Sequence, residues 1–205
     1  MSRRRRNGLV ALLAMVLLAV VCADRNWVRW RPGGSQVRRA GWDVAVYQDR
    51  QFVVVKVVDG DTLDIDEPDG KYETTRIRLW GVDCPESVNP ETGPMYFGPE
   101  ASAFAKGLAE GQTVRVLLDP GNDTRCKYGR LLAYVELPDG RILNETLLEE
   151  GHAYADLRFR HSHFDRYKQL EAVARSSGVG LWAGVTRSQL PAWLQRMKPR
   201  LLANN

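Results

Sequence analysis

The sequence predicts a mixed α+β fold in which a five-stranded β-barrel carries about three helices. The first observation is a run of three strand patterns joined by tight turns, which is typical of a curled antiparallel meander. A helical pattern then separates these strands from two further strands, and two more helical patterns follow. Five strands with a helix between the third and the fourth is the layout of an OB-type barrel.

The first three strands are predicted from β-branched and alternating residues. Residues 52–58 are apolar and rich in valine, and they stop at the turn signal of residues 59–61. Residues 62–66 and 74–80 each alternate apolar with polar side chains, as expected for strands that turn one face to a core. A proline, an aspartate and a glycine at 68–70 predict the turn between them.

The second half of the chain is predicted to begin with a loop and then to mix strands with helices. Three prolines and two glycines between residues 85 and 98 predict the loop, and Pro99 then stands in the first turn of a helix, where proline is tolerated. The predicted elements are, in order, helix 99–108, strand 113–118, strand 131–136, helix 142–150 and helix 164–176.

The N-terminal 23 residues have the pattern of an export signal. Four arginines at positions 3–6 precede an apolar run over residues 9–21. This order matches the charged and apolar regions of a secretory signal peptide, and the run is short for a membrane span, which needs about 20 residues. The alternatives are an uncleaved anchor that tethers the protein through residues 7–23, and a lipid-modified Cys22. We therefore expect an exported protein that is secreted, periplasmic or surface-tethered.

Four regions follow from these patterns: a signal peptide or anchor at 1–23, a polar linker or arm at 24–49, a barrel domain at 50–182, and a tail at 183–205. The whole chain has 29 Lys and Arg against 25 Asp and Glu. Residues 1–23 contain four of the arginines and no acidic residue, so the rest of the chain is formally neutral. Net charge therefore does not indicate nucleic-acid binding, and any such interpretation must depend on where the charges lie.

Acidic residues and two arginines stand close to the predicted strand ends. Asp61 and Asp83 lie in turns, where carboxylates can converge on a hard cation such as Ca²⁺. Arg78 and Arg130 offer the paired donors that recognise phosphate, and Glu86 follows in the next loop. Phosphodiester hydrolysis needs positive charge beside the phosphorus, a base that takes a proton from water, and in-line placement of the reacting oxygens. Together these residues could supply all three.

The motifs around these residues resemble the staphylococcal nuclease family over roughly residues 51–182. The matching stretches are VVDGDT at 57–62, RLWGVDCPE at 78–86, YFGPEASAF at 96–104, KYGRLLAYV at 127–135, and DG at 139–140 with Asn144. Each stretch is a weak signal alone, whereas all of them in this order and spacing are specific. The resemblance implies an OB-fold barrel that hydrolyses DNA and RNA with Ca²⁺.

The resemblance implies the metal-binding and base residues. Asp61 and Asp83 match the calcium carboxylates, and Cys84 stands where the family donates a main-chain carbonyl to the metal, usually from threonine. Because the carbonyl does not depend on the side chain, this difference need not prevent calcium binding. Glu86 matches the general base proposed for the family.

The resemblance also implies the substrate contacts. Arg78 and Arg130 match the two phosphate-binding arginines, and Tyr128 matches a tyrosine that packs near the nucleotide phosphate. Cys126 stands where the family often has an acid, so Cys84 and Cys126 both fall in segments expected to line the site. They form either a disulfide or two separate thiols.

Two aromatic residues near the last predicted helix are candidates for a base contact. Tyr154 and Phe159 are candidates to stack on a base, although aromatic residues at such positions pack as often in a core. The alternative function is a non-catalytic OB-fold module that binds single-stranded nucleic acid. Such modules lose the acidic and arginine positions, whereas this chain has all five of these residues: Asp61, Arg78, Asp83, Glu86 and Arg130. We expect DNA and RNA as substrates, no obligate protein partner, and a monomer.

Overall fold

The computed structural model describes residues 33–88 and 93–202. The predicted signal peptide, the first part of the predicted linker and the last residues of the predicted tail lie outside this part of the chain. Among the helices of the described residues, none combines the length and the apolar character that crossing a membrane requires.

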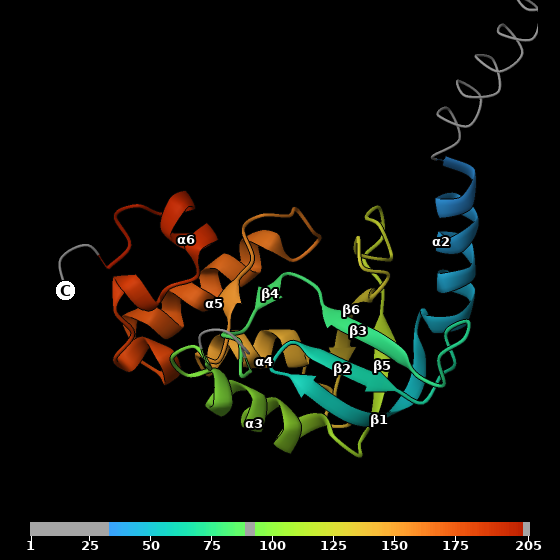
Figure 1. Cartoon of the computed structure of the whole chain (residues 1–205), viewed down its shortest axis with the longest axis horizontal. Helices are drawn as coiled ribbons and strands as arrows, with labels where there is room; N and C mark the ends of the chain where they lie inside the picture. Colours follow the sequence, from blue (N-terminus) through green and yellow to red (C-terminus); the bar gives the residue numbers. More distant parts are fainter. Residues whose placement is uncertain (1–32, 89–92, 203–205) are drawn as a thin grey trace, which may run out of the picture. The chain divides into compact units, whose positions relative to one another are not determined.

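Five strands close into a barrel, as predicted, and their order around it is β1-β2-β3-β6-β5 (Figure 1). The strands are β1 (Arg50–Asp59), β2 (Thr62–Ile65), β3 (Thr75–Leu79), β5 (Thr113–Leu117) and β6 (Leu131–Glu136). β3 and β6 pair in parallel, and the other neighbours are antiparallel. β1 shifts register twice against β2, and such bulges bend a strand. The bent β1 therefore pairs with β2 through its second half and with β5 through its first half.

The alternation of buried and exposed side chains along the strands shows which residues form the barrel core. Thr75, Ile77 and Leu79 of β3 are buried, whereas Arg76, between Thr75 and Ile77, is exposed. β6 is buried almost throughout because α4 (Leu143–Glu149) packs against it. The fully buried side chain of Asn144 joins the two elements, since it accepts a hydrogen bond from the Val135 amide (3.1 Å) and donates one to the Ala133 carbonyl (3.3 Å).

The predicted helices occur where expected. α3 (Gly98–Ala109) packs against β1, and α5 (Phe164–Ser176) packs against α4. Two short strands were not predicted: β4 (Val82–Asp83) pairs in antiparallel fashion with β7 (Tyr154–Ala155) beside the barrel. Two residues carry too little alternation to predict a strand, so this small sheet depends on the tertiary structure.

A helix, α2 (Gly33–Tyr47), occupies much of the region predicted as a linker. No helix was expected there, because residues 24–49 are polar and contain a proline and two glycines at 32–34. The end of α2 is nevertheless part of the barrel domain. Asp43 and Tyr47 are fully buried, and the Tyr47 hydroxyl shares a 2.8 Å hydrogen bond with the Thr75 hydroxyl on β3.

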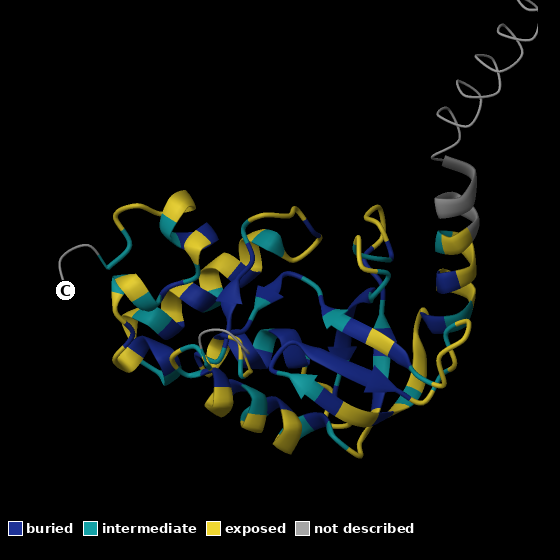
Figure 2. Cartoon of the chain, viewed as in Figure 1, coloured by how far each residue is buried: buried dark blue, intermediate teal, exposed yellow. Residues whose placement is uncertain are grey.

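The segment after residue 184 packs rather than trailing as a tail. It contains a 3-10 turn, η2 (Arg187–Gln189), and a short helix, α6 (Ala192–Met197). Figure 2 shows buried residues alternating with exposed ones through α5 and α6. Leu190, Trp193 and Leu194 are buried in a second apolar cluster together with Trp182.

Candidate active site

Asp61 lies at the end of the turn between β1 and β2 and is only 3% exposed. One carboxylate oxygen accepts from the Thr62 hydroxyl (3.0 Å), and the other accepts from the main-chain amide of Cys84 (2.8 Å). Gly60 makes this contact possible, because a Cβ at that position would lie 2.8 Å from the Cβ of Cys84. The turn is thereby held against the segment that follows β4.

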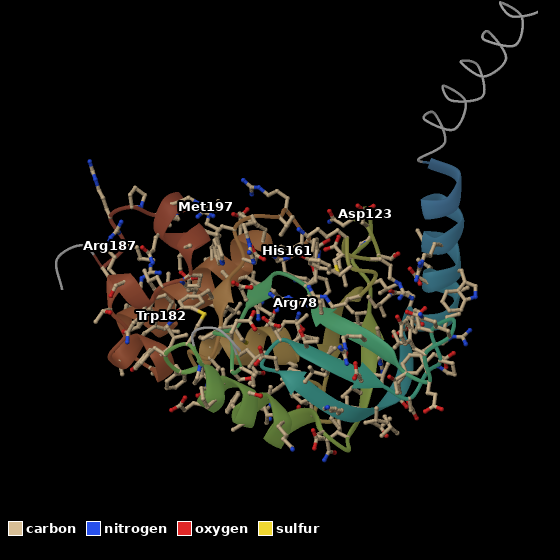
Figure 3. The ribbon with its side chains drawn as sticks, in the orientation of Figure 1. Arg78, Asp123, His161, Trp182, Arg187 and Met197 are labelled. Carbon is tan, nitrogen blue, oxygen red and sulfur yellow. The ribbon has the colours of Figure 1, made fainter. Side chains whose placement is uncertain are left out.

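Arg78 connects the two predicted calcium carboxylates. Its guanidinium forms ion pairs with Asp61 and with Asp83, the latter at 2.5 Å. The nitrogen that pairs with Asp83 also donates to the Val82 carbonyl at 3.3 Å. Arg78 is labelled near the junction of β3 and β4 in Figure 3, and its side chain is 16% exposed. The structure therefore brings together three of the residues that the sequence analysis selected.

The residues present fit a calcium ion. Asp61 and Asp83 already converge on one cationic group, and oxygens are the ligands that Ca²⁺ prefers. Within residues 33–88 and 93–202, no three His, Cys, Asp or Glu side chains form a cluster suited to a metal. The described side chains would therefore supply two carboxylates, and the Cys84 carbonyl, water and substrate oxygens would have to supply the other ligands.

Glu86 lies beside a third acidic group of this site. Burial raises the pKa of its carboxyl, and the neighbouring Asp59 raises the pKa further through a hydrogen bond and its charge. Asp59 itself accepts from the amides of Gly60 (2.9 Å) and Ser87 (3.3 Å). The Glu86 loop lies against the start of α3, where a Cβ on Gly98 would be 2.2 Å from the Glu86 carbonyl oxygen. These contacts hold Glu86 on the same side of the barrel as Asp61.

Arg130 and Tyr128 come from the loop that precedes β6. The guanidinium carbon of Arg130 lies 5.5 Å from the Tyr128 ring centre, and its Nε donates to the Cys126 thiol at 3.5 Å. Tyr128 is 72% exposed. Burial opposes ionisation of Cys126, but Arg130 and two main-chain donors outweigh it and lower the pKa of the thiol. Cys84 is buried, and both described cysteines are free thiols, so the disulfide alternative is not supported.

The sequence analysis missed how this loop is anchored. Arg125, which is 8% exposed, donates to Asp43 of α2 at 2.7 Å and forms an ion pair with Asp69. The Thr124 hydroxyl donates to the same Asp43 carboxylate at 2.6 Å. Figure 3 labels Asp123 in this loop. The partners lie 82 and 56 residues from Arg125 in the chain, so no local pattern could have indicated them.

The site opens into a cleft of about 970 Å³. Its lining combines arginines with aromatic and acidic residues: Arg78, Asp83, Glu86, Tyr128, Arg130, Asp156, Arg158, Phe159 and Arg160 among others. Asp61 is not part of the lining. Guanidinium groups and exposed aromatic rings on one cleft wall are the features that bind a phosphate backbone and stack on bases.

Comparison with known proteins identifies the family. A family model described as staphylococcal nuclease homologue matches residues 76–184, which is more than half of the chain. The chain belongs to the staphylococcal nuclease family. The thermonuclease of Staphylococcus hyicus is 37% identical over 136 residues, which are 66% of this chain and 77% of that protein. The thermonuclease of Staphylococcus intermedius is 33% identical over 177 residues, 84% of this chain and 95% of that protein.

A bacillar relative extends the comparison. Endonuclease YncB of Bacillus subtilis (strain 168) is 35% identical over 130 residues, which are 62% of this chain and 59% of that protein. The names of these relatives support a nuclease function. Most of the predicted site residues fall within the matched family span, whereas Asp61 precedes it and the segment after residue 184 follows it.

Within residues 76–184, the structure places at the site an arginine that was not among the predicted residues. Arg158 lines the cleft and donates to Asp83 at 3.0 Å. Asp156 holds the same guanidinium through two further hydrogen bonds, of 2.8 and 2.7 Å. The signal available in the sequence was an acid and an arginine spaced by two after β7, which is too common to be informative.

The two proposed stacking residues have different positions. Tyr154 is fully buried and packs edge-on against Trp182 with 5.4 Å between ring centres, so its proposed role on a base is wrong. Its place on β7 turns the ring into the second apolar cluster. Phe159 is 52% exposed at the cleft and lies 5.9 Å from the Trp80 ring. It stays a candidate to stack on a base.

A buried histidine under the cleft predicts acid sensitivity. His161 packs against Gly81 and shares a 3.1 Å hydrogen bond with the Tyr134 hydroxyl, and burial lowers the pKa of its imidazole to about 4. The unfolded chain would titrate near 6.5, so it binds more protons than the folded chain below that pH. We expect the neutral, buried His161 to make its full contribution to the free energy of unfolding above pH 6.5. This free energy should fall as the pH decreases from about 6.5 to 4.

Urea unfolding followed across this pH range measures the effect. One unit of pKa difference corresponds to about 1.4 kcal/mol, so a loss of a few kcal/mol is expected. His161→Gln removes the titrating group and should flatten the dependence over this window. An unchanged slope in that variant would assign the acid sensitivity to other groups.

Proposed function

We propose that this protein is a calcium-dependent endonuclease that hydrolyses the phosphodiester bonds of DNA and RNA. The observation that supports this most is the placement of Arg78 between Asp61 and Asp83 at the base of a cleft that Arg130 and Glu86 also line. One site therefore combines a carboxylate pair for a cation with two phosphate donors and a candidate base. The proposal adds the ion, the substrates and the residue roles to the family assignment.

Asp61, Asp83 and the Cys84 carbonyl would hold the calcium ion. Bound there, the ion would supply positive charge that offsets the charge on the phosphoryl oxygens. Arg78 contacts both carboxylates and faces the cleft, so it lies between the cation-binding and the phosphate-binding sides of the site. Arg130 donates paired N–H groups to the phosphate and stabilises the charge that grows in the transition state.

Glu86 serves as the general base. Its carboxylate takes a proton from a water molecule as the water oxygen bonds to phosphorus, and the bond from phosphorus to the leaving sugar oxygen breaks. Arg130 stands on the same cleft, where it can stabilise the leaving oxygen until that oxygen gains a proton. Tyr128 packs beside Arg130 and would line the path of the phosphate.

The purified protein tests this proposal directly. Cleavage of single-stranded DNA, double-stranded DNA and RNA is measured with Ca²⁺ and again with excess chelator. Cleavage that requires the ion supports the proposal. Retained binding of single strands without any cleavage would instead support the non-catalytic binding module.

Replacing Glu86 with glutamine is expected to lower kcat by about 100- to 10,000-fold, the range attributed to a positioned acid or base. Glutamine has the same size but cannot take the proton. Calcium binding in the absence of substrate should change little because Glu86 is not among the proposed ligands. Glu100→Gln, at an exposed position in the first turn of α3, is the matched control. Wild-type kcat in Glu86→Gln would remove Glu86 from the mechanism.

We also propose that the protein is exported. The four arginines and the apolar run that follows them support an export signal. The proposed state is a monomer without an obligate protein partner.

A further inference from the structure

The C-terminal segment contributes a hydrogen bond to the active site. The indole Nε1 of Trp193, on α6, donates to Oδ2 of Asp83 at 2.7 Å. The two residues are 110 positions apart. Trp193 also lies outside residues 76–184, the span that matches the family. This contact therefore reaches the site from outside the residues that match the family model.

The segment that carries Trp193 is held in place by its own contacts. Thr186 and Gln189 form a capping box around η2, and the Gln195 side chain donates to the Leu190 carbonyl at 2.7 Å. Trp193 is 8% exposed, and Leu194 beside it is fully buried. A side chain held in this way presents its indole N–H at a defined point.

Arg158 strengthens the same arrangement. Its guanidinium lies 4.7 Å from the Trp193 ring centre and donates to Oδ1 of Asp83 at 3.0 Å. Arg78 donates to that same oxygen at 2.5 Å. Both oxygens of Asp83 thus have assigned donors: arginines on Oδ1, and the Trp193 indole on Oδ2.

This pattern determines how the Asp83 carboxylate is turned. A carboxylate without such partners rotates about its last bond and must be ordered whenever it binds a ligand, which costs conformational entropy. Here β4 sets the main chain through its pairing with β7, in which Asp83 lies opposite Tyr154. The indole N–H then keeps Oδ2 on the α6 side, so that Oδ1 faces Arg78 and, through it, Asp61.

We propose that Trp193 is a positioning residue for calcium binding. By holding Oδ2 of Asp83, it pre-orients this carboxylate toward the cation position shared with Asp61, and so raises the affinity for Ca²⁺. The inference rests on the proposed calcium-dependent function and extends it to a segment outside the family match. Partners that orient a metal ligand in this way typically account for about 10- to 100-fold in metal affinity.

Trp193→Phe in the full chain tests the proposal, with Trp182→Phe as the matched control. Phenylalanine keeps an aromatic ring for packing and removes only the indole N–H and part of the ring system. Trp182 is equally buried in the same cluster, and its indole N–H has no hydrogen-bond acceptor within the described part of the chain. The control therefore measures the effect of replacing a buried indole by a smaller phenyl ring when no hydrogen bond to Asp83 is lost.

Calcium binding is measured by titration calorimetry without substrate. We expect Trp193→Phe to bind Ca²⁺ about 10-fold more weakly and Trp182→Phe to bind like the unchanged chain. Equal affinities in the two variants would overturn the role of Trp193. No calcium binding by the unchanged chain would overturn the proposed function itself, so the two failures are distinguishable.

Kinetics separate positioning from a general structural effect. In Trp193→Phe, the calcium concentration for half-maximal activity should rise by the same factor as the dissociation constant, while kcat at saturating calcium recovers. A fall in kcat that calcium does not restore would indicate structural damage and contradict the proposal.

A measurement on the unchanged chain covers the case in which Trp193→Phe does not fold. In protein labelled with nitrogen-15 at tryptophan, the Trp193 indole N–H signal should shift on addition of Ca²⁺, and Asp83→Asn should abolish this shift. If no indole signal in the unchanged chain responds to calcium that calorimetry shows to be bound, Trp193 does not contact a ligand carboxylate and the inference is wrong.

Discussion

Replacing Arg130 with alanine is expected to lower kcat by about 1,000-fold and to leave the fold intact. Arg130 lines the cleft at the entrance to β6, and the contacts recorded for its side chain are local, with Cys126 and Tyr128. Removal of one donor to the charge of a transition state typically costs about 100- to 1,000-fold. Arg130 offers two such donors in a fixed fork, so the upper end of this range is expected.

The effect should appear in kcat more than in KM, because the charge that Arg130 stabilises grows in the transition state. Initial rates on single-stranded DNA with saturating Ca²⁺ give both constants. Arg141→Ala is the control, since Arg141 is exposed and pairs with Asp139 in a turn that does not line the cleft. Thermal unfolding checks the fold. Near-wild-type kcat in Arg130→Ala would show that this arginine does not serve the reaction.

The second large effect is expected for Asp61→Asn, which should abolish activity at calcium concentrations that saturate the wild type. Asparagine has nearly the same shape and can still accept from the Cys84 amide, but it lacks the charge that attracts a dication. Loss of a partner behind a metal ligand already costs about 10- to 100-fold in affinity, so the loss of a ligand carboxylate is expected to weaken calcium binding at least as much.

Asp64→Asn is the matched control for this substitution. Asp64, on β2, is likewise a buried carboxylate that pairs with an arginine, Arg76 at 2.8 Å, but Arg76, unlike Arg78, does not line the cleft. Calorimetric titration with Ca²⁺ and activity as a function of calcium concentration are compared in both variants. An unchanged calcium titration in Asp61→Asn would exclude Asp61 as a ligand, whatever its effect on the rate.

The barrel strands were predictable because their signals are local. In β3, apolar and polar residues alternate, and the buried Ile77 and exposed Arg76 follow that alternation. The turn at 59–61 was predictable for the same reason, since glycine and aspartate favour turns over strands. The helix α2 was not predictable, because its end is stabilised by contacts with residues distant in the sequence: Asp43 pairs with Arg125, and the buried Tyr47 bonds to Thr75.

By itself, the sequence predicted the succession of strands and helices in the barrel domain and selected the candidate site residues: Asp61, Arg78, Asp83, Glu86 and Arg130. Only the tertiary structure decided that Tyr154 turns into a core, that Arg125 anchors the loop bearing Arg130, and that Trp193 and Arg158 hold Asp83. The physical reason is the range of the interactions. Alternation and turn preference act between near neighbours in the chain, whereas Arg158 and Trp193 lie 75 and 110 residues from Asp83 and meet it only once the chain has folded.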